Sequence, residues 1–249
     1  AALTVASCGF DVAKHGGRSA SGNFGSADLI AALGIPDVLS PQLSQEDLRA
    51  LHFAFYFAPS FLPALARVAP IRSEIGRPTA LNVILPLLNP ARPAFHLMGV
   101  YDSRLLYPVA FALQQLGIRR ALVVSGAEGY DEMTTTGETR TMEVTASAIT
   151  ENVVVPEDCN VSRVEAASLR CDTPAQSLAA AILTVTGVPT PVLQMVALNA
   201  GHALYVAGHV DSAARGVSLA LDTLREGRVY KLVTALRSIC YPTKRMSLR

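Results

Sequence analysis

The 249-residue sequence contains few charged residues and no surplus of either sign. Asp, Glu, Lys and Arg make up 16% of the chain, against about a quarter in typical soluble proteins. Lys and Arg number 21 and Asp and Glu number 20, so the excess positive charge on which nucleic-acid binding largely depends is absent. The scarcity of charge suggests that part of the surface is covered by another subunit or by a segment outside this sequence.

Long apolar runs, paired cysteines and several well-known motifs are also absent. The longest apolar stretches, 80–88 and 191–208, are interrupted by polar residues or proline, so neither has the length of a membrane span. The four cysteines show no C-x-x-C spacing, which excludes common zinc-site patterns and favours a reduced, cytoplasmic protein. There is no G-x-G-x-x-G, no P-loop and no G-x-S-x-G, and no catalytic nucleophile or base is assigned.

The segment 14–28, KHGGRSASGNFGSAD, is the most distinctive part of the sequence. It holds four glycines, four small hydroxyl or amide side chains and three basic groups. Glycines let backbone N–H groups approach a ligand closely, and these groups suit a phosphate when hydroxyls and positive charge stand beside them. Asp28 leads an apolar helical pattern, so the segment is expected to deliver its ligand to a helix N-terminus. A flexible basic surface turn is the alternative, and the length of the run favours a ligand site.

Alternating strand and helix patterns predict an α/β fold with a mostly parallel central sheet flanked by helices. A helix over 1–8 and a short strand over 10–13 lead into the glycine-rich segment, as expected where a phosphate site lies at the carboxyl ends of strands. Residues 41–77 show helical periodicity and predict a helical insert, while 1–40 and 78–249 form the α/β domain. Further strands are expected over 79–88, 95–100, 120–125, 139–149 and 151–155, and helices over 105–116, 175–186, 191–207 and 211–226.

Two adjacent acids, Asp131 and Glu132, follow the strand expected over 120–125. Carboxylates beyond the end of a strand can hold Mg²⁺, which commonly bridges to a phosphorylated substrate. A pair of acids near a helix start has the same appearance, so the residues alone leave both interpretations open. Arg72, near the end of the helical insert, is either a solvated residue at a helix C-terminus or a ligand of a substrate carboxylate.

Several segments together resemble the anthranilate phosphoribosyltransferase family and, more distantly, the pyrimidine nucleoside phosphorylases. Each motif is weak by itself, but the eight follow one another in the family's order, and the similarity runs from residue 1 to about 239. The segments are 12–18 (VAKHGGR), 25–28 (GSAD), 57–59 (FAP), 68–72 (VAPIR), 86–91 (PLLNPA), 99–102 (GVYD), 131–132 (DE) and 199–208 (NAGHALYVAG).

The resemblance implies an enzyme of tryptophan biosynthesis that transfers the phosphoribosyl group of phosphoribosyl pyrophosphate (PRPP) to the amine of anthranilate. Mg²⁺ would be bound by Asp131 and Glu132, and anthranilate would contact Gly17, Arg72 and Pro86. The resemblance also implies a cytoplasmic homodimer formed through a small helical lobe, to which 41–77 would belong. By matching position, the residues that would bind PRPP are Lys14, His15, Gly16, Gly17, Arg18, Ser19, Ala20, Ser21, Gly22 and Ser26.

The chain departs from the family pattern at several positions. Gly17 replaces an asparagine that helps to hold substrate, and 21–23 (SGN) stands where the family has Ser-Ser-Lys. Leu62 replaces the histidine of His-Pro-Ala-Met, and Ser125 replaces the histidine of Val-His-Gly. The family's Gly-Thr-Gly-Gly-Asp pyrophosphate loop, its Asn-x-Ser-Thr segment and its N-terminal helices have no counterpart and would lie upstream of residue 1.

Two alternative functions stay open. One is a paralogue with a different acceptor, motivated by Gly17 and Leu62, or a nucleoside phosphorylase-like enzyme. The other is a non-catalytic relative that binds a phosphorylated ligand or nucleic acid. Loss of the site is disfavoured by the retained residues Arg18, Arg72, Asp131 and Glu132. The balanced charge argues against nucleic acid.

Overall fold

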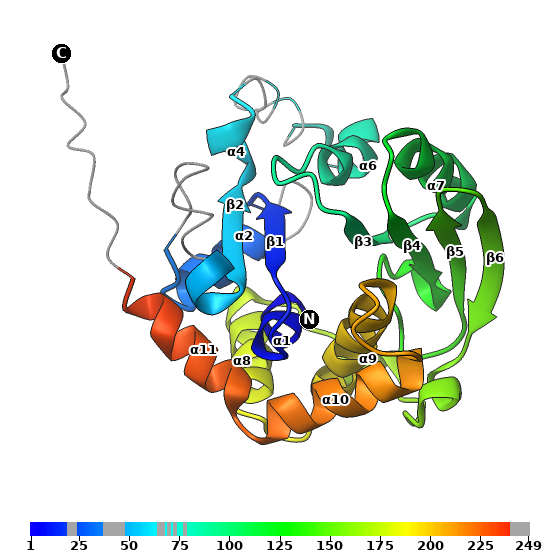
Figure 1. Cartoon of the computed structure of the whole chain (residues 1–249). Helices are drawn as coiled ribbons and strands as arrows, with labels where there is room; N and C mark the ends of the chain where they lie inside the picture. The colour runs from blue at the N-terminus through cyan, green and yellow to red at the C-terminus, as the bar shows by residue number, and fades with distance from the viewer. Residues whose placement is uncertain are drawn as a thin grey trace, which may run out of the picture.

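The computed structural model describes residues 1–18, 24–36, 48–63, 68, 71, 74–76 and 79–239. The predictions that fall on Ser19, Ala20, Ser21, Gly22 and Arg72 lie outside these ranges. Within the ranges, no helix is long and apolar enough to cross a membrane. The chain folds as a mixed α/β protein, which confirms the predicted fold class (Figure 1).

Strands β1 (Val12–Gly16) and β2 (Phe53–Phe57) form a parallel pair. The expectation of a wholly helical segment over 41–77 is therefore wrong at β2, which is followed by the short helix α4 (Ala58–Phe61). The sequence of β2, FAFYF, shows no polar alternation because four of its five residues are buried, so both faces of the strand are covered. A continuous apolar run of this length fits a buried strand or a buried helix equally well.

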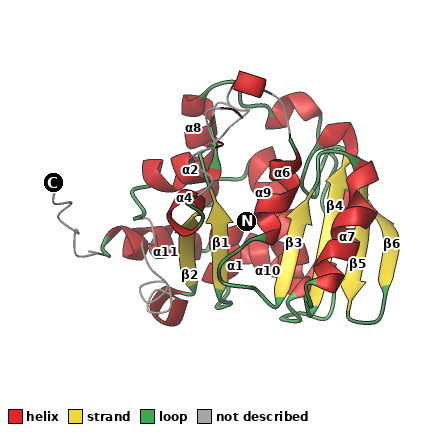
Figure 2. Cartoon of the chain, turned by 90° about the horizontal axis from the view of Figure 1, so that it is seen from above, coloured by secondary structure: helices red, strands yellow, loops and turns green. Residues whose placement is uncertain are grey.

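A second sheet contains β3 (Phe95–Gly99), β4 (Arg120–Gly126), β5 (Thr139–Thr145) and β6 (Ile149–Val154), in that order. Strands β3 and β4 are parallel, whereas β4, β5 and β6 are antiparallel. The arrangement is therefore less uniformly parallel than predicted, because the short turn 146–148 between β5 and β6 permits only antiparallel pairing. Figure 2 shows β2 and β1 beside β3 in one row of strands.

Helix α6 (Ala80–Leu87) occupies the segment that was expected to be a buried strand, so that prediction is wrong. Thr79 precedes the helix, and its backbone N–H donates to Oδ1 of Asn82 at 3.0 Å. This bond satisfies a donor at the helix start. Pro86 belongs to the last turn of α6 rather than to the end of a strand.

Helix α9 (Pro191–Val206) contributes side chains to two hydrophobic clusters of the core. Leu204 packs in a cluster with residues of β2, whereas Leu198 and Val206 pack in a cluster with residues of β4. Helix α7 (Leu106–Gln115) covers the opposite face of the second sheet. The other helices and turns are α1 (Ala2–Ser7), α2 (Ser26–Ala32), η1 (Ser103–Leu105), η2 (Ala127–Gly129), η3 (Pro156–Cys159), η4 (Ala166–Leu169), α8 (Pro174–Val185), α10 (Ala213–Arg225) and α11 (Arg228–Arg237).

Candidate active site

The glycine-rich segment begins in β1 and ends where α2 begins, so the predicted order of strand, loop and helix is confirmed. Gly16 ends β1 and packs closely against the first residue of α2, since a Cβ on Gly16 would lie 3.3 Å from the Cβ of Ser26. Asp28 accepts a hydrogen bond from the N–H of Gly25 at 2.9 Å and pairs with Arg18 at 3.2 Å. These contacts join the two described ends of the segment.

Lys14 extends from β1 into a region where its ammonium group is screened from water. Burial lowers the pKa of Lys14, and attraction to Glu132 and Asp131 partly offsets this shift. Burial, followed by repulsion from Lys14, lowers the pKa of His96 to about 4, so His96 is uncharged at neutral pH. The structure therefore brings a cation of the glycine-rich segment close to the acidic pair, which lies far from it in the sequence.

Asp131 and Glu132 lie in the connection between β4 and β5, beyond the carboxyl end of β4, as predicted. The N–H of Gly126 donates to the carbonyl of Tyr130 at 2.8 Å, which closes the turn that precedes them. Both acids are exposed at the residue level. The pKa of Glu132 is nevertheless raised, first by loss of water around its carboxyl group and then by the charge of Asp131, while Lys14 opposes the shift.

The acidic pair by itself does not make a complete metal site. Among the residues that the structure describes, no group of three or more His, Cys, Asp or Glu side chains could hold a metal ion. Mg²⁺ usually keeps several waters and binds through one or two carboxylates together with substrate phosphates. An exposed carboxylate pair near the half-buried Lys14 fits this mode, in which a phosphorylated ligand supplies the remaining oxygens.

A cavity of about 270 Å³ lies between β1, α6 and β3. Lys14, His15 and Pro86 all line it, so a residue expected to contact anthranilate lies next to two residues expected to contact PRPP. Nε2 of His15 is buried and has no hydrogen-bond partner within the described ranges, which leaves it available to a ligand. Gly17 and Ser26 do not line this cavity.

Two residues of this cavity were missed by the sequence reasoning. Nδ2 of Asn89 donates to the carbonyl of Ala13 at 3.0 Å and so ties the segment after α6 to β1. His96, from β3, faces the same cavity. Asn89 belongs to the PLLNPA segment and could have been singled out there, whereas a lone histidine in an apolar strand gives no such signal.

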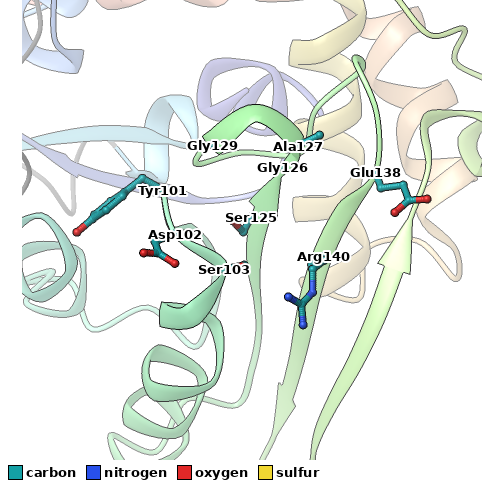
Figure 3. A pocket seen from close by; sticks show the side chains of 9 residues that line it. All are labelled: Tyr101, Asp102, Ser103, Ser125, Gly126, Ala127, Gly129, Glu138 and Arg140. Atoms are coloured by element: carbon teal, nitrogen blue, oxygen red, sulfur yellow. The ribbon is translucent and has the colours of Figure 1, made fainter.

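A larger cavity of about 490 Å³ lies at the carboxyl ends of β3 and β4 but contains none of the predicted site residues (Figure 3). Two of its three charged side chains already have partners, because Asp102 pairs with Arg104 and Arg140 pairs with Glu151. The residues around it are Tyr101, Asp102, Ser103, Ser125, Gly126, Ala127, Gly129, Glu138 and Arg140. Size alone therefore does not identify the site.

Comparison with known proteins places the chain in a family. Residues 1–230 match the family model described as "Glycosyl transferase family, a/b domain". The anthranilate phosphoribosyltransferase of Nitrosomonas europaea is 40% identical over 235 residues, which cover 94% of this chain and 69% of that protein. The one from Methanopyrus kandleri is 41% identical over 239 residues, with 94% and 70% covered. The chain belongs to the anthranilate phosphoribosyltransferase family.

Solved structures of anthranilate phosphoribosyltransferases share this fold. The enzyme from Thermus thermophilus has a TM-score of 0.86 and 38% identity, with 95% of this chain and 70% of that chain covered. The Saccharomyces cerevisiae enzyme in complex with PRPP and Mg has a TM-score of 0.81 and 23% identity, with 94% and 67% covered. At that identity the yeast structure supports the fold alone.

Proposed function

We propose that this chain transfers the phosphoribosyl group of PRPP to the amine of anthranilate, in tryptophan biosynthesis. The observation that carries the proposal is the approach of Lys14 to Asp131 and Glu132 beside the cavity that Pro86 lines. In this reaction the bond from ribose C1 to the pyrophosphate oxygen breaks, a bond from C1 to the amine nitrogen forms, and the nitrogen loses one proton.

The proposed roles follow from the charge of the leaving group. Pyrophosphate leaves readily only when its charge is neutralised, which Lys14 and the backbone N–H groups of the glycine-rich segment would do. Asp131 and Glu132 are the residues that would hold Mg²⁺, which when bound supplies further charge neutralisation. The aromatic amine needs placement more than a strong base, which agrees with a site to which no catalytic base is assigned.

The acceptor would occupy the cavity between β1 and α6. Pro86 offers an apolar wall there, and the buried Nε2 of His15 is available for a hydrogen bond. Arg72 and Gly17 complete the proposed anthranilate contacts on the basis of the family resemblance alone. The remaining proposed PRPP contacts are Gly16, Arg18, Ser26 and the segment 19–22.

Loss of anthranilate fluorescence in the presence of PRPP and Mg²⁺ is the direct test of this function. Product formation should require all three components, and mass spectrometry should detect the N-linked phosphoribosyl adduct. Omission of PRPP or of Mg²⁺ provides the controls. Binding of PRPP and Mg²⁺ without any turnover of anthranilate would reject anthranilate as the acceptor and favour a paralogue with another one.

Gly17 is the specific observation that favours such a paralogue. A Cβ at this position would meet no atom of the described residues within 4 Å, so they leave space where the family has an asparagine. If anthranilate is the acceptor, Gly17→Asn should fit without strain and lower the KM for anthranilate, because the amide adds a polar contact. A KM that stays unchanged or rises would indicate that this space serves a different acceptor.

We also propose a cytoplasmic homodimer in which 41–77, apart from strand β2, contributes to a small helical lobe at the dimer interface. The low content of charged residues supports a surface that is partly covered by a second copy. Sedimentation equilibrium should give twice the monomer mass. A monomer at every concentration would contradict this proposal.

A further inference from the structure

The connection that carries Asp131 and Glu132 is held by tertiary contacts rather than by its own secondary structure. Residues 131–134 belong to no helix or strand. Gly99, at the end of β3, lies so close that a Cβ there would come within 1.5 Å of the carbonyl oxygen of Asp131. A Cβ on Gly126 would come within 2.8 Å of the carbonyl oxygen of Glu132. The backbone of the acidic pair therefore lies flat against the ends of two strands.

A third contact comes from the middle of α9. Oδ1 of Asn199 accepts a hydrogen bond from the N–H of Met133 at 2.9 Å, and Nδ2 donates to the carbonyl of Met133 at 2.8 Å. Nδ2 also donates to the carbonyl of Met195 at 2.9 Å. A carboxamide has one acceptor oxygen and two N–H donors, and all of them are engaged here. Asn199 and Met133 are both buried.

Asparagine is a poor choice for α9 considered by itself. Its side chain competes with the backbone for hydrogen bonds, so it is disfavoured inside helices. An apolar residue would also bury more favourably at this position in the core. The two hydrogen bonds to Met133 supply the reason for an amide here, because no apolar side chain could satisfy both backbone groups of that buried residue.

We infer that Asn199 is a positioning residue for the Asp131–Glu132 pair. By binding both backbone groups of Met133, it fixes the peptide next to Glu132 and keeps the acidic pair in place against the ends of β3 and β4. Within the described ranges, the hydrogen bonds of the Asn199 side chain all go to backbone groups, of Met133 and Met195, so its effect reaches the metal through the backbone. The inference rests on the proposed function, in which these carboxylates hold Mg²⁺ with PRPP.

Asn199→Asp in the full chain tests this role, because the carboxylate keeps the shape of the amide but lacks both N–H donors. Mg²⁺ is titrated by calorimetry at saturating PRPP. The dissociation constant for Mg²⁺ should rise about tenfold or more, as is typical when a residue that orients metal ligands is removed. PRPP binding without metal should stay unchanged, and activity should recover at raised Mg²⁺.

His202→Leu is the matched control on the same helix. His202 is buried, and its Nδ1 lies 2.8 Å from the carbonyl of Leu198, so the substitution removes a comparable interaction without touching the acidic connection. The control should keep the parent's affinity for Mg²⁺. An equal loss in His202→Leu would overturn the inference, since the effect would then be a general loosening of α9.

A second pair of variants reaches the same connection without changing α9, in case Asn199→Asp does not fold. In Gly126→Ala the added methyl group would clash with the carbonyl oxygen of Glu132, at 2.8 Å, and so displace the acidic pair. This variant should also weaken Mg²⁺ binding. Gly137→Ala, in the same connection, meets only the Cβ of Ala127 at 3.2 Å and should bind Mg²⁺ as the parent does. Parent-like affinity in a folded Asn199→Asp would overturn the inference, and so would parent-like affinity in Gly126→Ala if Asn199→Asp does not fold.

Measurements of Mg²⁺ binding and of product formation by the parent protein distinguish failure of this inference from failure of the proposed function. If the parent binds Mg²⁺ with PRPP but makes no product from anthranilate, the acceptor is wrong and the metal titration still decides the role of Asn199. If the parent binds no Mg²⁺ with PRPP, both the function and the positioning role are overturned.

Discussion

Lys14 and the carboxylates of Asp131 and Glu132 bring opposite charges into one small region that is partly screened from water. Burial is the first cause of both pKa shifts there, downward for Lys14 and upward for Glu132. Each shift measures the cost of keeping that group charged without a full shell of water. A ligand that combines phosphate with Mg²⁺ offers negative charge to Lys14 and positive charge to the carboxylates. Its binding should therefore lower the free-energy cost of keeping both groups charged.

Asp131→Asn should abolish Mg²⁺-dependent binding of PRPP, because the amide keeps the shape of the side chain but removes the charge that the metal requires. Calorimetry with and without Mg²⁺ measures the effect. Glu138→Gln is the control, since Glu138 is an exposed acid of the same connection and should be dispensable. Equal PRPP binding by Asp131→Asn and the parent would contradict the metal assignment.

His96 should make the protein less stable as the pH falls from 6.5 to about 4. Over this interval the unfolded chain binds a proton at His96 and the folded chain does not, so the free energy of unfolding rises with pH. The shift from 6.5 to about 4 corresponds to roughly 3 kcal/mol at most. Urea unfolding at several pH values should show this slope in the parent and a smaller one in His96→Gln. Identical slopes would contradict the uncharged state of His96.

Helices α9 and α10 touch through their backbones at two glycines. A Cβ on Gly201 would lie 2.3 Å from the backbone nitrogen of Val217, and one on Gly216 would lie 2.3 Å from the carbonyl oxygen of Gly201. Neither helix can move away freely, because α9 also packs against both groups of strands. The observed packing of α9 on α10 therefore requires glycine at both positions.

Gly201→Ala should lower the free energy of unfolding by about 1–3 kcal/mol, the usual cost of overpacking, even though alanine is the better helix former. Chemical denaturation provides the measurement. Ser218→Ala, at an exposed position of α10, should change stability little and serves as the comparison. A Gly201→Ala variant as stable as the parent would show that the two helices can separate without loss.

The molecule as a whole depends on α9, because this helix belongs to two hydrophobic clusters. Leu204 lies in the cluster that contains Phe53 and Phe55 of β2, while Leu198 lies in the cluster that contains Leu122 and Val124 of β4. Hydrogen-bonded ladders do not join β1 to β3 within the described ranges, so side-chain packing on α9 holds the two groups of strands together. The two halves should therefore unfold together.

Leu204→Ala should cost about 2–5 kcal/mol, since it leaves a cavity at a fully buried position. Unfolding should remain a single transition when followed by tyrosine fluorescence and by far-UV circular dichroism. Leu116→Ala, at an exposed position after α7, is the comparison and should change stability little. Two separate transitions in the parent would mean that the halves are independent.

Local patterns in the sequence were enough to predict the α/β class, the loop between β1 and α2, and the place of Asp131 and Glu132 after a strand. The order of short motifs was enough to predict the family. These features depend on neighbouring residues, so they can be read without knowing the packing.

Tertiary structure decided the remaining features. The apolar runs 53–57 and 79–88 look alike in sequence, yet the first forms a strand with four buried residues and the second forms a helix with none. A short apolar run carries no polar period from which its shape could be predicted. Two interactions involve residues far apart in the chain: the electrostatic attraction between Lys14 and the acidic pair, and the hydrogen bonds between Asn199 and Met133. Such contacts exist only once the core has packed, and that is why the sequence alone did not reveal them.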